Sequence, residues 1–78
     1  MDNIQERVIA VIAREQSLEP TTITMDSTFE ALQIDSVSAI GIAFDIETEF
    51  DIDFSDDEMF GLKCVRDIVD GVSKLVKQ

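Results

Sequence analysis

Apolar residues at the start of the chain repeat with helical spacing. They lie three or four positions apart: Ile4, Val8, Val11 and Ile12. This spacing places the side chains on one face of a helix, which we expect over about 3–16. The following segment, 17–34, contains Pro20 and is rich in Thr and Ser, which predicts a long loop. Four apolar side chains would anchor this loop to a core: Ile23, Phe29, Leu32 and Ile34. Within it, Ser27 and Glu30 have the spacing of a capping box for one helical turn.

A second helix is expected over about 35–50, with Asp35 or Ser36 as its N-cap. At about 100° per residue, one side of this helix forms an apolar core stripe: Ala39, Ile42, Ala43, Ile46 and Phe50. Three further apolar residues fall on roughly the opposite side: Val37, Ile40 and Phe44. A small bundle cannot easily bury both faces of a helix. We therefore expect these three side chains to be exposed and to face a partner.

The segment after this helix, 50–54, alternates between apolar and acidic residues. No second strand exists to pair with it, so we expect an extended connector. Two of its side chains would fill the core: Ile52 and Phe54. Ser55 and Glu58 have capping-box spacing and predict a short third helix that ends at about Leu62.

The final helix, expected over about 65–77, has the clearest apolar periodicity. Its apolar residues are Val65, Ile68, Val69, Val72, Leu75 and Val76. The chain has 78 residues, with no Trp or Tyr, one Pro and three Gly, which suits one small helical domain. We therefore predict an all-α fold and a single domain over 1–78. The fold is a small four-helix bundle with a long loop between helices 1 and 2 and a short third helix. We expect a monomer.

Charge is unevenly distributed along the chain. The formal net charge is −11, and every charged residue from Glu15 through Glu58 is acidic. This charge disfavours nucleic acid and anionic membranes as partners, and it favours proteins with basic surfaces. The lone Cys64 cannot form an internal disulfide and no targeting signal is evident, so we expect a cytoplasmic protein. No apolar run approaches the roughly 20 residues that span a bilayer.

The sequence offers little for catalysis. It has no His, which excludes serine and cysteine triads and the zinc-protease motif within the chain. Asp51, Asp53 and Ser55 resemble the first ligands of an EF-hand, but Asp56 and Leu62 occupy its glycine and closing-glutamate positions. We therefore expect no specific metal site and no enzymatic activity.

Ser36 has two interpretations: a simple helix N-cap, or a site where an attached phosphate meets the free N–H groups and dipole of a helix. The surrounding sequence favours the second. LQIDSVSAI and FDIETEFDIDFSDDE resemble the acyl carrier protein family, and STFEAL and FSDDE extend the likeness along the chain. That family has an Asp-Ser-Leu triplet at the start of the second helix of a four-helix bundle. Asp35 and Ser36 match the triplet, and Val37 replaces its leucine.

This resemblance implies that Ser36 carries 4'-phosphopantetheine from coenzyme A. A phosphopantetheinyl transferase would attach it with magnesium, which Asp35 would help to place. The thiol of the arm would hold acyl groups as thioesters. Acyl-transferring and acyl-extending enzymes of fatty-acid, lipid or polyketide biosynthesis, with basic surfaces, would be the partners. The expected partner-binding residues are Val37, Ile40, Phe44, Asp45, Glu47 and Glu49.

Two departures distinguish this chain from the family pattern. Gln33 stands where the family commonly has glycine, which predicts a different loop path, and Ser38 and Gly41 stand where it usually has acids. We therefore expect a specialised stand-alone carrier. If the general fatty-acid synthase enzymes processed this protein as efficiently as they process the housekeeping carrier, this expectation would be wrong. Two alternatives stay open: a peptidyl or aminoacyl carrier domain, which loading assays would separate, and an unmodified acidic protein-interaction module in which Ser36 only caps a helix.

Overall fold

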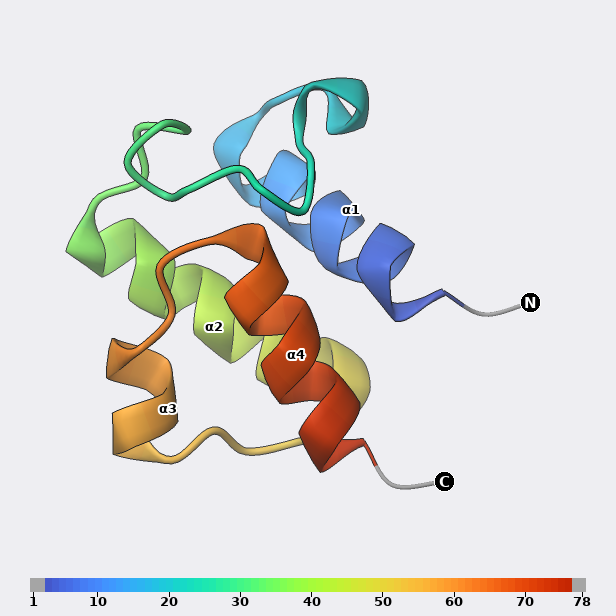
Figure 1. Cartoon of the computed structure of the whole chain (residues 1–78), viewed down its shortest axis with the longest axis vertical. Helices are drawn as coiled ribbons and strands as arrows, with labels where there is room; N and C mark the ends of the chain where they lie inside the picture. The colour runs from blue at the N-terminus through green and yellow to red at the C-terminus, as the bar shows by residue number, and fades with distance from the viewer. Residues whose placement is uncertain (1–2, 77–78) are drawn as a thin grey trace.

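Residues 3–76 are described by the computed structural model, and they form four α-helices around one core (Figure 1). The helices are α1 (Ile4–Gln16), α2 (Ser36–Phe50), α3 (Asp56–Phe60) and α4 (Val65–Leu75), with a 3₁₀ helix, η1 (Pro20–Thr22), in the loop between α1 and α2. Over 3–76 the only strand-like feature is an isolated bridge between Thr28 and Cys64. The all-α prediction is therefore confirmed. No helix in this part of the chain is long and apolar enough to cross a membrane.

The ends of the helices follow local capping chemistry. Ser55 accepts a hydrogen bond from the Glu58 N–H at 3.1 Å, and the Glu58 carboxylate accepts one from the Ser55 N–H at 2.8 Å, so the predicted capping box forms. The third helix ends at Phe60, before the predicted end at Leu62, because Gly61 is its C-cap. The last helix ends at Leu75, and the expected end at 77 lies outside the described residues.

The core lies where α1 packs against α2 and α4. Its largest fully buried side chains are Ile12, Ile42, Ile46, Ile68, Val8, Val11, Val65 and Val72. The core stripe predicted for the second helix is confirmed: Ile42, Ala43 and Ile46 are buried, and Ala39 and Phe50 are half-buried against the same core. Helical spacing of apolar residues therefore located the core faces of all three long helices.

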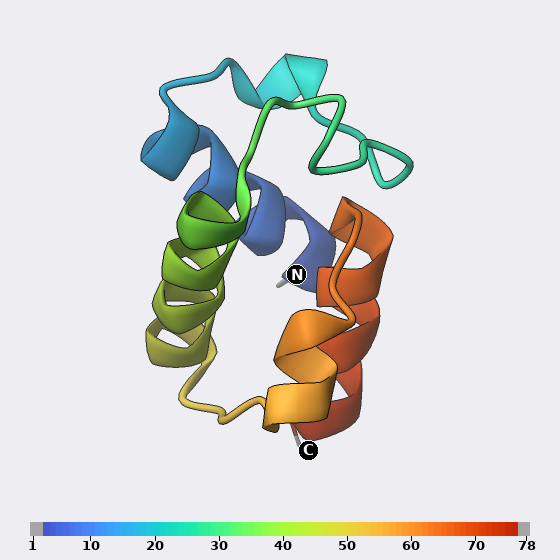
Figure 2. The same ribbon diagram turned by 90° about the vertical axis from the view of Figure 1, so that its left-hand side faces the viewer.

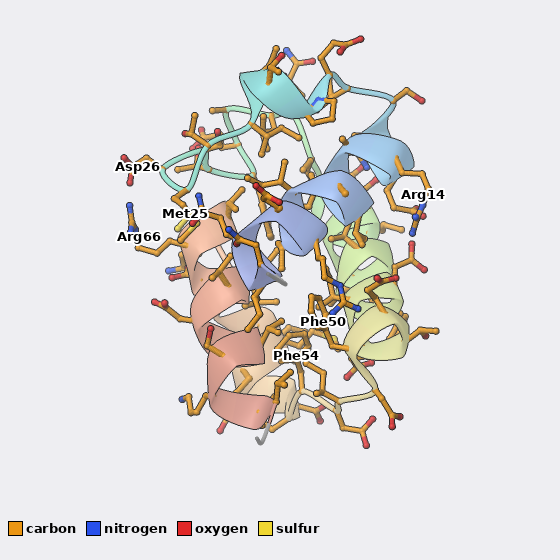
Figure 3. The ribbon with its side chains drawn as sticks, turned by 90° about the vertical axis from the view of Figure 1, so that its right-hand side faces the viewer. Arg14, Met25, Asp26, Phe50, Phe54 and Arg66 are labelled. Carbon is orange, nitrogen blue, oxygen red and sulfur yellow. The ribbon has the colours of Figure 1, made fainter. Side chains whose placement is uncertain are left out.

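The connector between α2 and α3 closes one end of the bundle. Phe54 is buried, as predicted (Figure 3). Ile52 is half-buried against the core, also as predicted. The Phe54 N–H donates a hydrogen bond to the Glu47 carboxylate at 2.7 Å. A Cβ on Gly71 would lie 3.0 Å from the Phe54 ring, so a glycine at this position of α4 lets the ring pack closely.

The long loop covers the opposite end of the bundle (Figure 2). Three backbone hydrogen bonds tie it to the segment before α4 and to the first turn of α4: Phe29 N–H to the Lys63 carbonyl, Val65 N–H to the Ser27 carbonyl, and Arg66 N–H to the Met25 carbonyl. Arg66 and Asp26 add an ion pair at this junction (Figure 3). The apolar side chains predicted to anchor the loop are indeed buried or half-buried: Ile23, Phe29, Leu32 and Ile34.

The predicted capping box between Ser27 and Glu30 is wrong. The Ser27 hydroxyl accepts a hydrogen bond from the Thr24 N–H at 2.9 Å, so it closes the preceding turn. Thr28 caps the next turn instead, because its hydroxyl accepts from the Ala31 N–H at 3.0 Å. The turn exists, but it starts one residue later than predicted.

Candidate functional site

Ser36 is the first residue of α2, and it is exposed. The N-cap is Asp35, whose carboxylate accepts a hydrogen bond from the Ser38 N–H at 2.8 Å. This bond from the Ser38 backbone, together with one from the Ser38 side chain, lowers the pKa of Asp35 below its usual value. Asp35 therefore caps the helix as a carboxylate. The Ser36 hydroxyl is not needed for capping, and it lies at the end of the helix where backbone N–H groups and the dipole favour an anion.

The loop fixes the position of this helix start. Ile34 is buried, and its N–H donates a hydrogen bond to the Phe29 carbonyl at 2.8 Å. Gln33 has a φ of 62°, in the left-handed region. Glycine adopts this conformation without steric cost, so Gln33 has the backbone shape that glycine would favour. This argues against the different loop path that we expected from the absence of glycine.

A surface groove of about 430 Å³ opens beside Ser36. It lies between the long loop, the start of α2 and the segment before α4, and it is lined by Thr28, Phe29, Glu30, Ile34, Asp35, Ser36, Ala39, Leu62 and Lys63. Ser36, Ala39 and Leu62 also border a smaller hollow of about 220 Å³ toward α3. Sequence reasoning missed the role of Leu62 and Lys63, because only the tertiary contacts of the loop bring them to Ser36.

Three large apolar side chains are exposed on α2 and α3. Val37 is 79% exposed and Phe44 is 54% exposed, which agrees with the predicted outward face. Ile40 is only half-buried rather than fully exposed, because it borders the hollow that also touches Met59 of α3. Phe60 of α3 is 74% exposed and was missed by sequence reasoning. The sequence offered one indication of its exposure, because Phe60 ends a helix of only five residues whose first turn is acidic.

The three acids predicted to form one recognition face on α2 are divided between two sides of the helix. Glu49 pairs with Arg7 of α1 at 3.1 Å, whereas the Glu47 carboxylate accepts its hydrogen bond from the connector. Asp45 faces Glu15 of α1, and a hydrogen bond between the two carboxyl groups raises the pKa of Glu15. Asp45 and Glu49 therefore lie toward α1, and Glu47 lies toward the connector.

We also looked for metal-ligand clusters and for the environment of the single cysteine. Over 3–76, no group of three or more His, Cys, Asp or Glu side chains is placed to hold a metal ion. Cys64 is half-buried just before α4 and is a free thiol.

Comparisons with known proteins agree with this fold. A family model described as phosphopantetheine attachment site matches residues 6–72. An acyl carrier protein of Rickettsia bellii is 40% identical over 95% of this chain and 87% of its own length. One from Onion yellows phytoplasma is 39% identical over 88% of this chain and 92% of its own length. The crystal structure of an acyl carrier protein from Thermotoga maritima superposes with a TM-score of 0.78 at 25% identity, covering 88% of this chain and 81% of that one.

The small all-α bundle formed by these four helices is the fold of an acyl carrier protein. The matches over most of the chain show that it belongs to the acyl carrier protein family, which the sequence resemblance had indicated.

Proposed function

We propose that this protein carries acyl groups and that Ser36 is the residue that receives 4'-phosphopantetheine. The main support for the proposal is the position of Ser36. It is the first residue of α2, it is exposed, and it lies beside a groove. Asp35 already caps the helix, which leaves the Ser36 hydroxyl available for modification.

The surroundings of Ser36 fit such an arm. Its phosphodiester would meet the N-terminal end of α2, which favours negative charge. Lys63 adds a basic residue to the groove, and Phe29, Ile34 and Leu62 provide apolar walls. These residues would hold the arm against the protein between visits to partner enzymes.

Attachment is a transfer from coenzyme A catalysed by a separate transferase. The Ser36 oxygen attacks the phosphorus next to the pantetheine, a new P–O bond forms, and the bond to the bridging oxygen of the diphosphate breaks. Adenosine 3',5'-bisphosphate leaves, and the hydroxyl proton passes to the transferase. Asp35, which is exposed and ionised, would help to place the magnesium ion in that complex.

The attached arm supplies a thiol that holds acyl groups as thioesters. The protein itself then acts as a carrier without catalytic activity, and enzymes of fatty-acid, lipid or polyketide biosynthesis act on its cargo. The net charge of −11 supports basic surfaces on those enzymes, since complementary charge speeds reversible encounters. Val37, Ile40 and Phe44 are proposed as direct contacts. We assign long-range attraction to Asp45, Glu47 and Glu49, because they do not form one face.

The proposal is tested by loading the purified protein. We expect incubation with coenzyme A, magnesium and a broad-specificity phosphopantetheinyl transferase to add the mass of one phosphopantetheine, measured by intact-mass spectrometry. Ser36→Ala should gain nothing. Ser73→Ala is the control, because it removes an exposed hydroxyl on α4, away from Ser36 and Asp35, and should still be loaded. Failure of the wild type with several transferases, or loading of Ser36→Ala, would reject Ser36 as the attachment site.

A further inference from the structure

Two hollows meet at Ser36, and their linings differ. The loop-side groove, of about 430 Å³, lies between the long loop, the start of α2 and the segment before α4. The α3-side hollow, of about 220 Å³, lies between α2 and α3. Ser36, Ala39 and Leu62 border both. The other residues that line the α3-side hollow are all apolar: Ile40, Met59 and Phe60. A group attached to Ser36 therefore has two places to lie.

Among the residues that the structure describes, Lys63 is the one base that lines either hollow. Two hydrogen bonds fix its backbone: its carbonyl accepts from the Phe29 N–H at 2.9 Å, and its N–H donates to the Asp67 carboxylate at 2.9 Å. The ion pairs found within residues 3–76 use Arg7 and Arg66, so no carboxylate in this part of the chain engages the Lys63 ammonium. A fixed backbone thus presents an unpaired cation at the loop-side groove.

The two hollows differ in what they offer a phosphopantetheine arm, whose phosphodiester is negatively charged. Two acids line the loop-side groove, Glu30 and Asp35, so a phosphate there requires a compensating cation. The Lys63 ammonium supplies it, because lysine binds phosphate as a point charge. Phe29 and Ile34 add apolar walls for the two methyl groups of the pantetheine. Size agrees, since this groove falls within the roughly 300–1,000 Å³ of small-molecule sites and the α3-side hollow is smaller.

From these observations we propose that Lys63 is a positioning residue that pairs with the phosphodiester on Ser36 and directs the arm into the loop-side groove, away from the α3-side hollow. This inference rests on the proposed function of Ser36. Exposed ion pairs are weak and are screened by salt, so Lys63 holds the arm reversibly. A partner with a basic surface brings competing cations to the same phosphate. Its approach therefore frees the arm from the groove.

Nuclear magnetic resonance of the loaded protein tests where the arm lies. Wild type and variants are first loaded from coenzyme A, and intact-mass spectrometry confirms one phosphopantetheine on each. In the wild type we expect nuclear Overhauser effects from the methyl groups of the pantetheine to Phe29 and Ile34. Lys63→Met removes the charge and keeps most of the side-chain length. It should weaken these effects about two- to fivefold, the population change expected on loss of one exposed ion pair.

Lys74→Met is the matched control, because Lys74 is an exposed lysine of α4 that borders a hollow away from Ser36, and it should leave the effects unchanged. Raising NaCl from about 0.05 M to about 0.5 M should weaken them in the wild type and change Lys63→Met little.

Three results would overturn the proposal. The wild-type methyl groups could contact Ile40 and Met59 instead, they could show no contact with the protein, or their contacts with Phe29 and Ile34 could persist unchanged in Lys63→Met. A wild type that no transferase loads gives a different result, because it rejects the proposed function of Ser36 itself.

Discussion

The backbone conformation of Gln33 helps to position Ser36. Gln33 has a φ of 62° just before the buried Ile34, and its N–H donates a hydrogen bond to the Glu30 carbonyl at 3.0 Å. A residue with a Cβ pays about 1–2 kcal/mol to adopt this left-handed conformation, whereas glycine does not. The loop thus holds a strained residue three positions before Ser36, because the contacts of Phe29 and Ile34 with the rest of the fold outweigh that strain.

We expect Gln33→Gly to raise the free energy of unfolding by about 0.5–1 kcal/mol. Relief of the left-handed strain exceeds the extra entropy that glycine gives the unfolded chain. Urea denaturation followed by circular dichroism would measure the change. Gln5→Gly is the control, because Gln5 is exposed in α1 and the same substitution should destabilise a helix. A loss of stability in both variants would show that Gln33 is not strained.

At the scale of elements, periodicity predicted the three long helices, and capping residues located their ends. Ser55 was predicted as the cap of α3 because its capping box depends on a residue only three positions away, and Asp35 was one of the two caps predicted for α2, with Ser36 the other. Assigning all three acids of α2 to one face was wrong, because at about 100° per residue Glu47 lies on the opposite side of the helix from Asp45 and Glu49. The groove beside Ser36 escaped prediction because Leu62 and Lys63 reach it through pairing of the loop with the segment before α4.

The Glu58 carboxylate stabilises the start of the short helix α3. The hydrogen bond from the Ser55 N–H lowers the pKa of Glu58 below its usual value of 4.5. Because the folded pKa is the lower one, the ionised carboxylate stabilises the fold fully well above pH 4.5, and this contribution is lost as pH falls through the folded pKa. Glu58→Gln should therefore lower the melting temperature at pH 7, with a deficit that shrinks below pH 4.5.

Thermal melts of both proteins from pH 7 to pH 3 would test this dependence. Ser55→Ala is the companion variant, because it removes the neutral half of the capping box and should cost about 1 kcal/mol at every pH. A deficit of Glu58→Gln that stays constant down to pH 3 would mean that the carboxylate charge does not stabilise α3.

Across the whole molecule, repulsion between acidic side chains destabilises the folded state. The net charge is −11, and the ion pairs between Arg7 and Glu49 and between Arg66 and Asp26 both lie on the surface. Such pairs each contribute little. Glu15 and Asp45 place two carboxyl groups together, and the pKa of Glu15 is raised as a result. Ionisation of Glu15 therefore destabilises the fold above pH 4.5, the opposite sign to Glu58.

Salt should accordingly stabilise the protein. We expect the melting temperature at pH 7 to rise steadily with NaCl, because the Debye length falls to about 10 Å at 0.1 M and screens repulsion between carboxylates. Magnesium chloride should act at lower concentration, through diffuse binding to the acidic surface. Asp45→Asn removes one member of the repelling pair, so it should raise the melting temperature at low salt and lose this advantage at high salt. A melting temperature that neither salt changes would show that repulsion among the acids does not limit stability, and the acidic surface would then cost the carrier nothing in its free state.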